Sequence, residues 1–232
     1  MTAPIDAATF RGLQQAALDR CKEAGEVFKA RNASLEQERD VQRDAALAAM
    51  EVTLAPREGG RPGGFVIALG KEANITLEAI PAGTFLMGSP ESEGGPSDEH
   101  PQQPVTISHD FHMSATMITN QQYNVIMGAT ERRAQAEHRD LPAIEVNWFE
   151  AMEFCERLGN KLGRTFRLPT EAEWEYACRA GTTAAFYTGD TITTDQANFD
   201  GQEATRYNPA GVYRGDIIAV ATFPPNAWGL YD

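Results

Sequence analysis

Three glutamates stand close together in the sequence and could perform acid–base or metal chemistry. They are Glu171, Glu173 and Glu175 in RLPTEAEWEYACRAG, residues 167–181, where they surround Trp174. Paired carboxylates can act as general acid and base, and carboxylate oxygens bind hard cations. The stretch therefore admits three interpretations: a catalytic acid pair, a metal site, or the acidic first turn of a helix.

The local pattern favours the first turn of a helix. Thr170 and Glu173 have the spacing of a capping box, in which each side chain bonds the main-chain amide of the other residue. Pro169 precedes the cap and favours extended backbone there. Acids in a first turn complement the helix dipole, and Glu175 precedes Arg179 by four residues, the favourable order for an ion pair. The buried face of this predicted helix carries Trp174, Ala177 and Cys178.

Thiols and imidazoles are the other candidate nucleophiles and ligands. The three cysteines, Cys21, Cys155 and Cys178, are too few and too scattered for a disulfide framework or a zinc ribbon. His109 and His112 have H-x-x-H spacing, but residues three apart on a strand face opposite sides, so these rings should not converge on zinc. The sequence also has no G-x-S-x-G, Walker or dinucleotide-binding motif.

Composition narrows the class of partner. The chain has 232 residues, of which 42% are hydrophobic, and a formal net charge of -13. This charge argues against nucleic acid as a partner, because a phosphate backbone requires a basic surface. No apolar run approaches the roughly 18 residues of a membrane span, so we expect no membrane insertion. The N-terminus does not resemble a signal peptide, which predicts a cytoplasmic protein or one whose signal was removed.

The first 55 residues predict a helical hairpin appendage. Apolar residues recur there at helical spacing, with a break expected at Asn32, Ala33 and Ser34. The hairpin is expected to pack on the main domain or on another copy of the chain, so an oligomer through these helices is one expectation. A dedicated binding element is the alternative. Residues 56–74 predict a linker and a first strand, because the segment APREGGRPGG at 55–64 is rich in glycine and proline.

The remaining sequence mixes strands and helices. Alternating apolar segments at 65–70 and 73–83 predict short strands. Thr119 with Gln122 forms another capping-box pattern, and residues 147–163 have helical spacing. The region from residue 181 onward is loop-rich. Because no strand–helix–strand rhythm is present, the expected class is α+β.

Several long motifs occur in an order that resembles a known family. They are IPAGTFLMGS (80–89), ITNQQYNVIMG (118–128), LPAIEVNWFEAMEFC (141–155), RLPTEAEWEYACRAG (167–181) and FPPNAWGLYD (223–232). Together they resemble the formylglycine-generating enzymes, also called sulfatase-modifying factor domains, over residues 75–232. The strongest signature lies at Arg167, Leu168, Pro169, Thr170, Glu171, Glu173, Trp174 and Glu175.

The resemblance implies a fold and an activity. The fold would be a variant of the C-type lectin-like fold, low in regular secondary structure. Active members oxidise a cysteine of a target sulfatase to formylglycine with dioxygen and a copper ion held by two cysteines, which matches the preference of Cu(I) for thiolates. In the family this cysteine pair lies beyond the GLYD motif, at which this chain stops. We therefore expect the domain at 75–232 to be incomplete at its C-terminus, inactive as it stands, and able to bind copper only with those cysteines present.

The resemblance also suggests a calcium site and a role for two cysteines. One calcium site of active members uses an asparagine side chain and the next carbonyl, which correspond here to Asn198 and Phe199. Asp200 adds a hard oxygen ligand and Asp216 is a further candidate. The alternative is an Asx turn held by its own hydrogen bonds. Positions matching Cys155 and Cys178 form disulfides in secreted members, whereas here we expect buried free thiols.

Two main functions remain open at this point. The first is a formylglycine-generating oxidase with a sulfatase-like protein substrate. The second is a non-catalytic lectin-like module that binds a displayed ligand or protein, as the variable proteins of diversity-generating retroelements do. A third reading is a scaffold that docks through its N-terminal helices. The expected partner is a protein or peptide in each case, and fold alone does not separate them.

Overall fold

The computed structural model describes residues 26, 31, 33–34, 37–38, 41–42, 44–59, 62–71, 73–94, 97–128 and 138–232. The chain divides into two compact units, Met1–Ala49 and Met50–Asp232. Every described residue of the first unit is helical, including Ala33 and Ser34, where the sequence predicts a break. Neither residue is a strong helix breaker, since only glycine and proline lower helix propensity greatly. The apolar positions of the predicted first helix lie outside the described residues.

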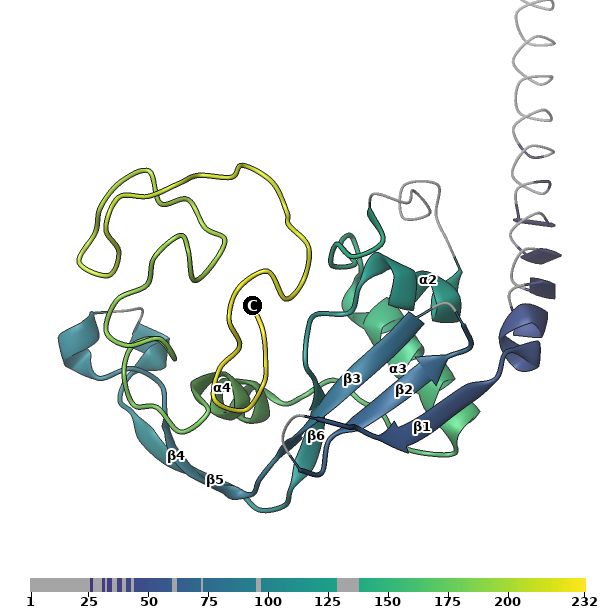
Figure 1. Cartoon of the computed structure of the whole chain (residues 1–232), viewed down its shortest axis with the longest axis horizontal. Helices are drawn as coiled ribbons and strands as arrows, with labels where there is room; N and C mark the ends of the chain where they lie inside the picture. Colours follow the sequence, from purple (N-terminus) through teal and green to yellow (C-terminus); the bar gives the residue numbers. More distant parts are fainter. Residues whose placement is uncertain are drawn as a thin grey trace, which may run out of the picture. The chain divides into compact units, whose positions relative to one another are not determined.

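The second unit begins with a four-stranded antiparallel sheet (Figure 1). In spatial order its strands are β1 (Val52–Pro56), β2 (Phe65–Leu69), β3 (Ala73–Ile80) and β6 (Phe111–Ser114). Ile67 on β2 stands opposite Ile75 on β3, and both side chains are fully buried. Such cross-strand apolar pairs fix the register, because a slip by one residue would turn them to the other face.

The segment rich in glycine and proline connects β1 to β2 and is not a linker between domains. Pro56 pairs with Phe65, and the Arg57 amide donates to the Gly64 carbonyl at 2.9 Å. The Arg57 guanidinium also pairs with the buried carboxylate of Glu78 on β3. The compact unit therefore starts at Met50 and includes the residues at which the sequence predicts a linker. Glycine and proline mark turns inside a domain as readily as links between domains.

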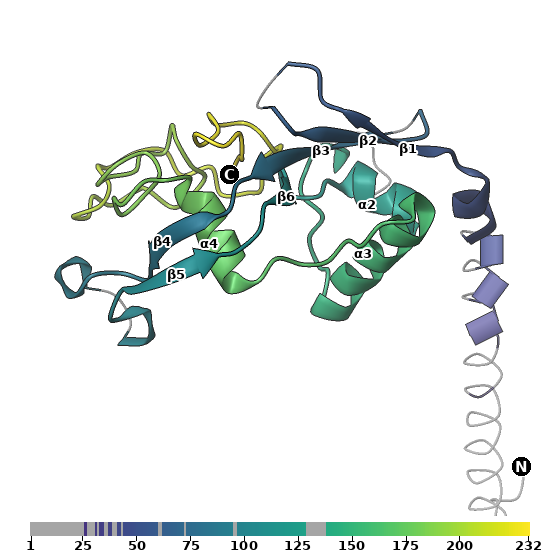
Figure 2. The same cartoon turned by 90° about the horizontal axis from the view of Figure 1, so that it is seen from below.

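Two helices cover one face of this sheet (Figure 2). They are α2 (Asn120–Met127) and α3 (Trp148–Leu162). Both begin at complete capping boxes, Thr119 with Gln122 as predicted and Asn147 with Glu150. The rings of Tyr123 and Phe154 stack with their centroids 5.8 Å apart, which joins the two helices.

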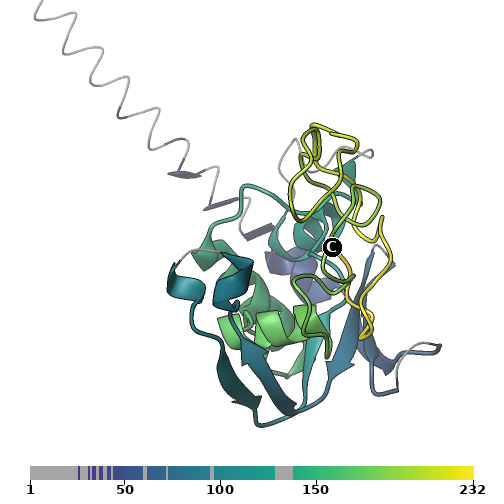
Figure 3. The same cartoon turned by 90° about the vertical axis from the view of Figure 1, so that its left-hand side faces the viewer.

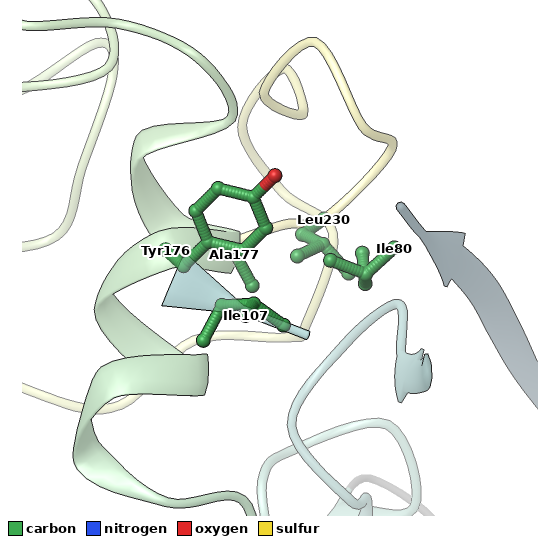
Figure 4. Close-up of a cluster of buried hydrophobic side chains, with 5 residues drawn as sticks. All are labelled: Ile80, Ile107, Tyr176, Ala177 and Leu230. Carbon is green, nitrogen blue, oxygen red and sulfur yellow. The ribbon is translucent and has the colours of Figure 1, made fainter. Parts of the chain in front are cut away.

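A second group of elements lies beside the sheet. It consists of β4 (Gly83–Met87) paired antiparallel with β5 (Gln103–Ile107), the short 3-10 turns η1 (Glu91–Glu93) and η2 (Ser97–Glu99) between them, and α4 (Glu171–Arg179). Figure 4 shows the apolar cluster that joins these elements to β3. Its members are Ile80, Ile107, Tyr176, Ala177 and Leu230.

The segment after α4 has no helix or strand, as expected from its composition. Figure 3 shows residues 181–232 as a set of irregular loops. The last of them reaches the apolar cluster through Leu230, and the amide of the next residue, Tyr231, donates to the Ala115 carbonyl at 2.8 Å. The mixture of sheet and helix confirms the predicted α+β class.

Candidate functional site

Two of the three glutamates of α4, Glu173 and Glu175, are engaged in structural contacts, whereas Glu171 is exposed in the first turn. Glu173 accepts two hydrogen bonds from the Arg167 guanidinium, each 2.6 Å long. It also accepts one from the Thr170 amide at 2.8 Å, and Thr170 Oγ1 accepts from the Glu173 amide, so the predicted capping box is complete. The Arg167 hydrogen bonds lower the pKa of Glu173 to about 2. A carboxyl group with this pKa carries no proton near neutral pH, so it is unsuited to act as a general acid.

Glu175 connects α4 to the end of β4. It accepts from the Gly88 amide at 3.0 Å and from Arg179 Nε at 2.8 Å, so the predicted ion pair is confirmed. Arg179 Nη2 donates in turn to the Gly88 carbonyl at 2.9 Å. The pair therefore satisfies both main-chain groups of Gly88 and holds the strand against the helix.

The buried face of α4 matches the predicted one only in part: Ala177 is buried as predicted, and Cys178 is half-buried. Trp174 is 58% exposed, so its predicted place in the core is wrong. The buried stripe is formed by Tyr176, Ala177 and Ala180. Ala180 follows Ala177 by three residues and Tyr176 by four, which places all three on one side of the helix. This stripe faces β4 and β5, and Trp174 lies outside it because only one narrow face of the helix meets the strands.

The two described cysteines are free thiols, but they are only half-buried, whereas buried free thiols are expected from the sequence. Cys155 lies on α3 and Cys178 on α4, and both are half-buried. Burial raises the pKa of each thiol. Cys155 belongs to α3, which packs on α2 and β1, whereas Cys178 belongs to α4, which packs on β4 and β5. The two thiols thus belong to different parts of the fold and do not fit the two-cysteine copper site that the family resemblance implies, and Cys21 lies outside the described residues.

The predicted calcium residues lie in a loop that hydrogen bonds hold together. Asn198 Nδ2 donates to the Asp216 carbonyl at 2.9 Å, so the structure brings these two residues together. The Asp200 carboxylate accepts from the Gln202 amide at 3.1 Å, which is an Asx-turn bond. The Asp216 carboxylate accepts from the Ile217 amide at 2.7 Å. The contacts match the Asx-turn alternative, and calcium binding at Asn198, Phe199 and Asp200 stays a prediction.

The histidines with H-x-x-H spacing have separate partners. His112 Nε2 lies 2.9 Å from the Gly63 carbonyl oxygen, and His109 Nδ1 lies 2.8 Å from Ser108 Oγ. Within the described part of the chain, no group of three or more histidine, cysteine, aspartate or glutamate side chains is arranged to hold a metal ion. No helix in that part is long and apolar enough to cross a membrane.

A pocket that the sequence does not reveal lies between β4, the end of α4 and the C-terminal loop. Its volume is about 190 Å³, and aromatic rings of Phe85, Tyr176 and Trp228 line it together with Thr182 and Thr183. The Tyr176 and Trp228 rings meet edge to face with centroids 4.8 Å apart. The pocket draws on three distant segments, so no local pattern could predict it.

Asn226 holds the C-terminal motif against α4 and so shapes this pocket. Its Nδ2 donates to the carbonyls of Ala177 and Cys178 at 2.8 and 3.1 Å. Its Oδ1 accepts from the amides of Trp228 and Leu230 at 2.9 and 3.2 Å. The side chain is buried, so these bonds fix the loop that carries Trp228.

Comparison with known proteins identifies similar sequences. The family model described as "Sulfatase-modifying factor enzyme 1-like domain" matches residues 71–232. The chain is 31% identical over 178 residues to the serine/threonine-protein kinase pkn1 of Chlamydia pneumoniae, covering 66% of this chain and 25% of the kinase. It is 25% identical over 232 residues to the formylglycine-generating enzyme of Bos taurus, covering 76% of this chain and 59% of that enzyme. The chain thus spans a quarter of the kinase and about three fifths of the enzyme.

The chain is also similar to a protein named as inactive and to a solved structure. The "Inactive C-alpha-formylglycine-generating enzyme 2" of Bos taurus is 22% identical over 218 residues, covering 72% of this chain and 70% of that protein. Treponema denticola variable protein 1 has a similar structure with a TM-score of 0.50 and 20% identity, covering 74% of this chain and 73% of that one. This likeness concerns the fold alone and supports the expected C-type lectin-like class.

Proposed function

Since this chain belongs to the sulfatase-modifying factor enzyme 1-like domain family, we propose that it is a formylglycine-generating-enzyme-like module that binds a protein or peptide. The family activity is copper- and dioxygen-dependent oxidation of a sulfatase cysteine. The role proposed for the described residues is partner binding without oxidation. The expected partner is a sulfatase-like protein or another displayed polypeptide.

The placement of the thiols is the observation that carries the non-catalytic part of this proposal. Cys155 lies on α3 and Cys178 on α4, and these two helices pack on different strands. A copper-dependent oxidase needs thiolates that converge on the metal. Two thiols in different parts of the fold are poor candidates for that role.

Charge and similarity support a polypeptide partner. The net charge of -13 disfavours nucleic acid and favours a partner with basic groups. Relatives include proteins named as generating formylglycine and one named as inactive, so the scaffold occurs with and without that activity. Function on such a scaffold depends on the site residues rather than on the fold.

Mass spectrometry tests the proposal directly. The chain is incubated with copper, dioxygen, a reductant and a fluorescent peptide that carries a sulfatase-type target cysteine. We expect fluorescence polarisation to report binding while the mass of the peptide stays unchanged. A matched peptide with alanine in place of the cysteine should bind equally well. Conversion of the cysteine to formylglycine would falsify the non-catalytic assignment, and absence of binding would contradict the partner class.

The second candidate is the oxidase itself, favoured by similarity to the formylglycine-generating enzymes of Bos taurus and Streptomyces coelicolor. If oxidation is observed, the double variant Cys155→Ser and Cys178→Ser identifies the copper ligands. Loss of turnover in this variant would assign them to the two described thiols. Retained turnover would exclude both thiols as ligands.

A further inference from the structure

The strand β4 has one edge without a partner strand. Among the described residues it pairs only with β5, in a two-stranded sheet that is separate from the four-stranded one (Figure 1). Thr84 is exposed and Leu86 is 46% exposed, so the middle of the strand is accessible. An accessible edge presents amide and carbonyl groups that can pair with another chain.

The register identifies which residues of β4 direct their main-chain groups to that edge. Leu86 stands opposite Pro104, whose nitrogen carries no hydrogen and is expected to point away from the neighbouring strand. Thr84 and Thr106 have hydroxyl oxygens 2.9 Å apart, as expected where paired residues share no main-chain bonds and side chains approach closely. Gly88, in the same alternation, bonds α4 instead of β5. Thr84 and Leu86 therefore direct N–H and C=O outward.

The pocket described above borders this edge. Thr84 and Leu86 line it, together with Phe85 and with Thr182 and Thr183 from the segment after α4. A strand added to an open edge gains affinity from main-chain hydrogen bonds and specificity from pockets that take alternate side chains. The site thus offers outward main-chain groups beside a pocket with aromatic walls, hydroxyl groups and the side chain of Arg179, whose charge is paired with Glu175.

Acidic residues next to β4 favour a basic partner. The connection from β4 to β5 begins directly after Met87 and carries Glu91, Asp98 and Glu99, all exposed. The whole chain has a net charge of -13. A polypeptide that runs along β4 therefore meets acidic side chains at one end, which favours lysine or arginine there.

We propose that the edge of β4 binds an extended, basic peptide segment as an added strand, with one apolar side chain in the pocket lined by Phe85, Tyr176 and Trp228. The assignment rests on the proposed function and locates its binding site. The main-chain groups of Thr84 and Leu86 supply the pairing, and the acidic connection sets the charge preference.

Fluorescence polarisation tests this site with a labelled probe peptide in which lysine and valine alternate around a central leucine. We expect binding that weakens as salt increases, because the charged groups are exposed. A copy with glutamate in place of lysine, and a copy with N-methyl groups on alternate amides, should each bind at least about tenfold more weakly. Equal binding of all three peptides would overturn the proposal.

Variants of the full chain locate the site. Leu86→Pro removes an outward donor but no bond to β5, whereas Leu86→Ala keeps the donor and removes the side chain. The proline variant should bind the probe about tenfold more weakly than the alanine variant. Thr183→Phe fills the pocket from an exposed position and should also weaken binding, whereas Thr53→Phe, at an exposed site on β1, should not.

The outcomes separate this site from the proposed function. If the sulfatase-type peptide binds but neither Leu86→Pro nor Thr183→Phe changes binding of either peptide, the β4 site is wrong and the binding function stands. If thermal melting shows that Leu86→Pro unfolds, Thr183→Phe and the N-methylated peptide decide the question. Tight binding of the probe to Thr183→Phe together with tight binding of the N-methylated peptide to the unmodified chain would overturn the site.

Discussion

Glu173 and Glu175 are two residues apart on α4 and perform different tasks. The Glu173 carboxylate accepts hydrogen bonds from Arg167 and Thr170 at the start of the helix. The Glu175 carboxylate accepts one from the amide of Gly88, which follows β4. Residues two apart on a helix point in nearly opposite directions, which explains the division. At the level of single residues, Glu173 serves as part of a cap and Glu175 as a connection between elements.

The Arg167–Glu173 pair should make the free energy of unfolding depend on pH in the acid range. The pKa of Glu173 is about 2 in the folded state, below its ordinary value of 4.5. The contribution of the ion pair to folding stability is therefore fully present above pH 4.5 and is lost as the pH falls toward 2. Arg167→Ala should lower the free energy of unfolding by about 0.5–1 kcal/mol near neutral pH, since Arg167 is half exposed. Urea unfolding measured along an acid titration should show the two proteins converging, and a constant difference would contradict this.

Calcium binding at Asn198 can be tested by thermal unfolding. We propose that calcium raises the melting temperature relative to a chelator, and that Asn198→Ala removes the effect. At a concentration a hundred times the dissociation constant, the gain should be about 2.7 kcal/mol. Asn147→Ala, at the cap of α3, serves as a control that should keep the response. Identical melting with calcium and with chelator would show that the loop is held by its hydrogen bonds alone.

The helices and loops depend on a few side chains that close their ends. Each of α2, α3 and α4 starts at a capping box, and Asn226 donates to the carbonyls of Ala177 and Cys178 near the end of α4. Unsatisfied amides and carbonyls at helix ends are costly when buried. The caps therefore position the elements as well as stabilise them.

The cap of α3 provides a simple element-level prediction. Asn147 Oδ1 accepts from the Glu150 amide at 3.0 Å in an exposed setting. Asn147→Ala should lower the free energy of unfolding by about 1 kcal/mol, while Asn147→Asp, which keeps an acceptor, should cost far less. Chemical denaturation of the two variants checks this. An equal loss in both would mean that the side-chain acceptor is not what stabilises the helix.

Asn226 should matter more than an exposed cap. Asn226→Ala removes four hydrogen bonds in a buried setting and leaves the Ala177 carbonyl without this donor. The expected loss in free energy of unfolding is about 2–4 kcal/mol. Because the loop then no longer holds Trp228, tryptophan fluorescence should also change. A loss no greater than that of Asn147→Ala, with unchanged fluorescence, would contradict this role.

The whole molecule consists of two units with different kinds of structure. The described residues of Met1–Ala49 are helical, and Met50–Asp232 contains both sheets and all three labelled helices. The second unit includes β1, which lies before the region that resembles the family in sequence. The first strand completes the sheet through its pairing with β2.

Separating the units tests the predicted role of the N-terminal helices. We expect residues 50–232 to fold without the first unit, with cooperative thermal unfolding, because that unit has its own core. We expect the full chain to form oligomers and residues 50–232 to be monomeric in light scattering. The same oligomeric state in both proteins would show that the N-terminal helices do not mediate oligomer formation.

The features that could be predicted from the sequence are those whose partners lie within one helical turn. The Thr170 capping box and the Glu175–Arg179 pair join residues three and four apart, and such contacts can be inferred from spacing. The ordered motifs likewise indicated the family, because each is a continuous run of residues.

Contacts between distant segments could not be inferred in this way. Glu175 and Arg179 meet Gly88 across 87 and 91 residues, and the pairing of Pro56 with Phe65 turned an expected linker into a hairpin. The exposure of Trp174 and the pocket beside β4 arise from the same packing. Local hydrogen bonds depend on residue type and spacing, whereas burial depends on which distant surfaces meet, and that is settled when the chain folds.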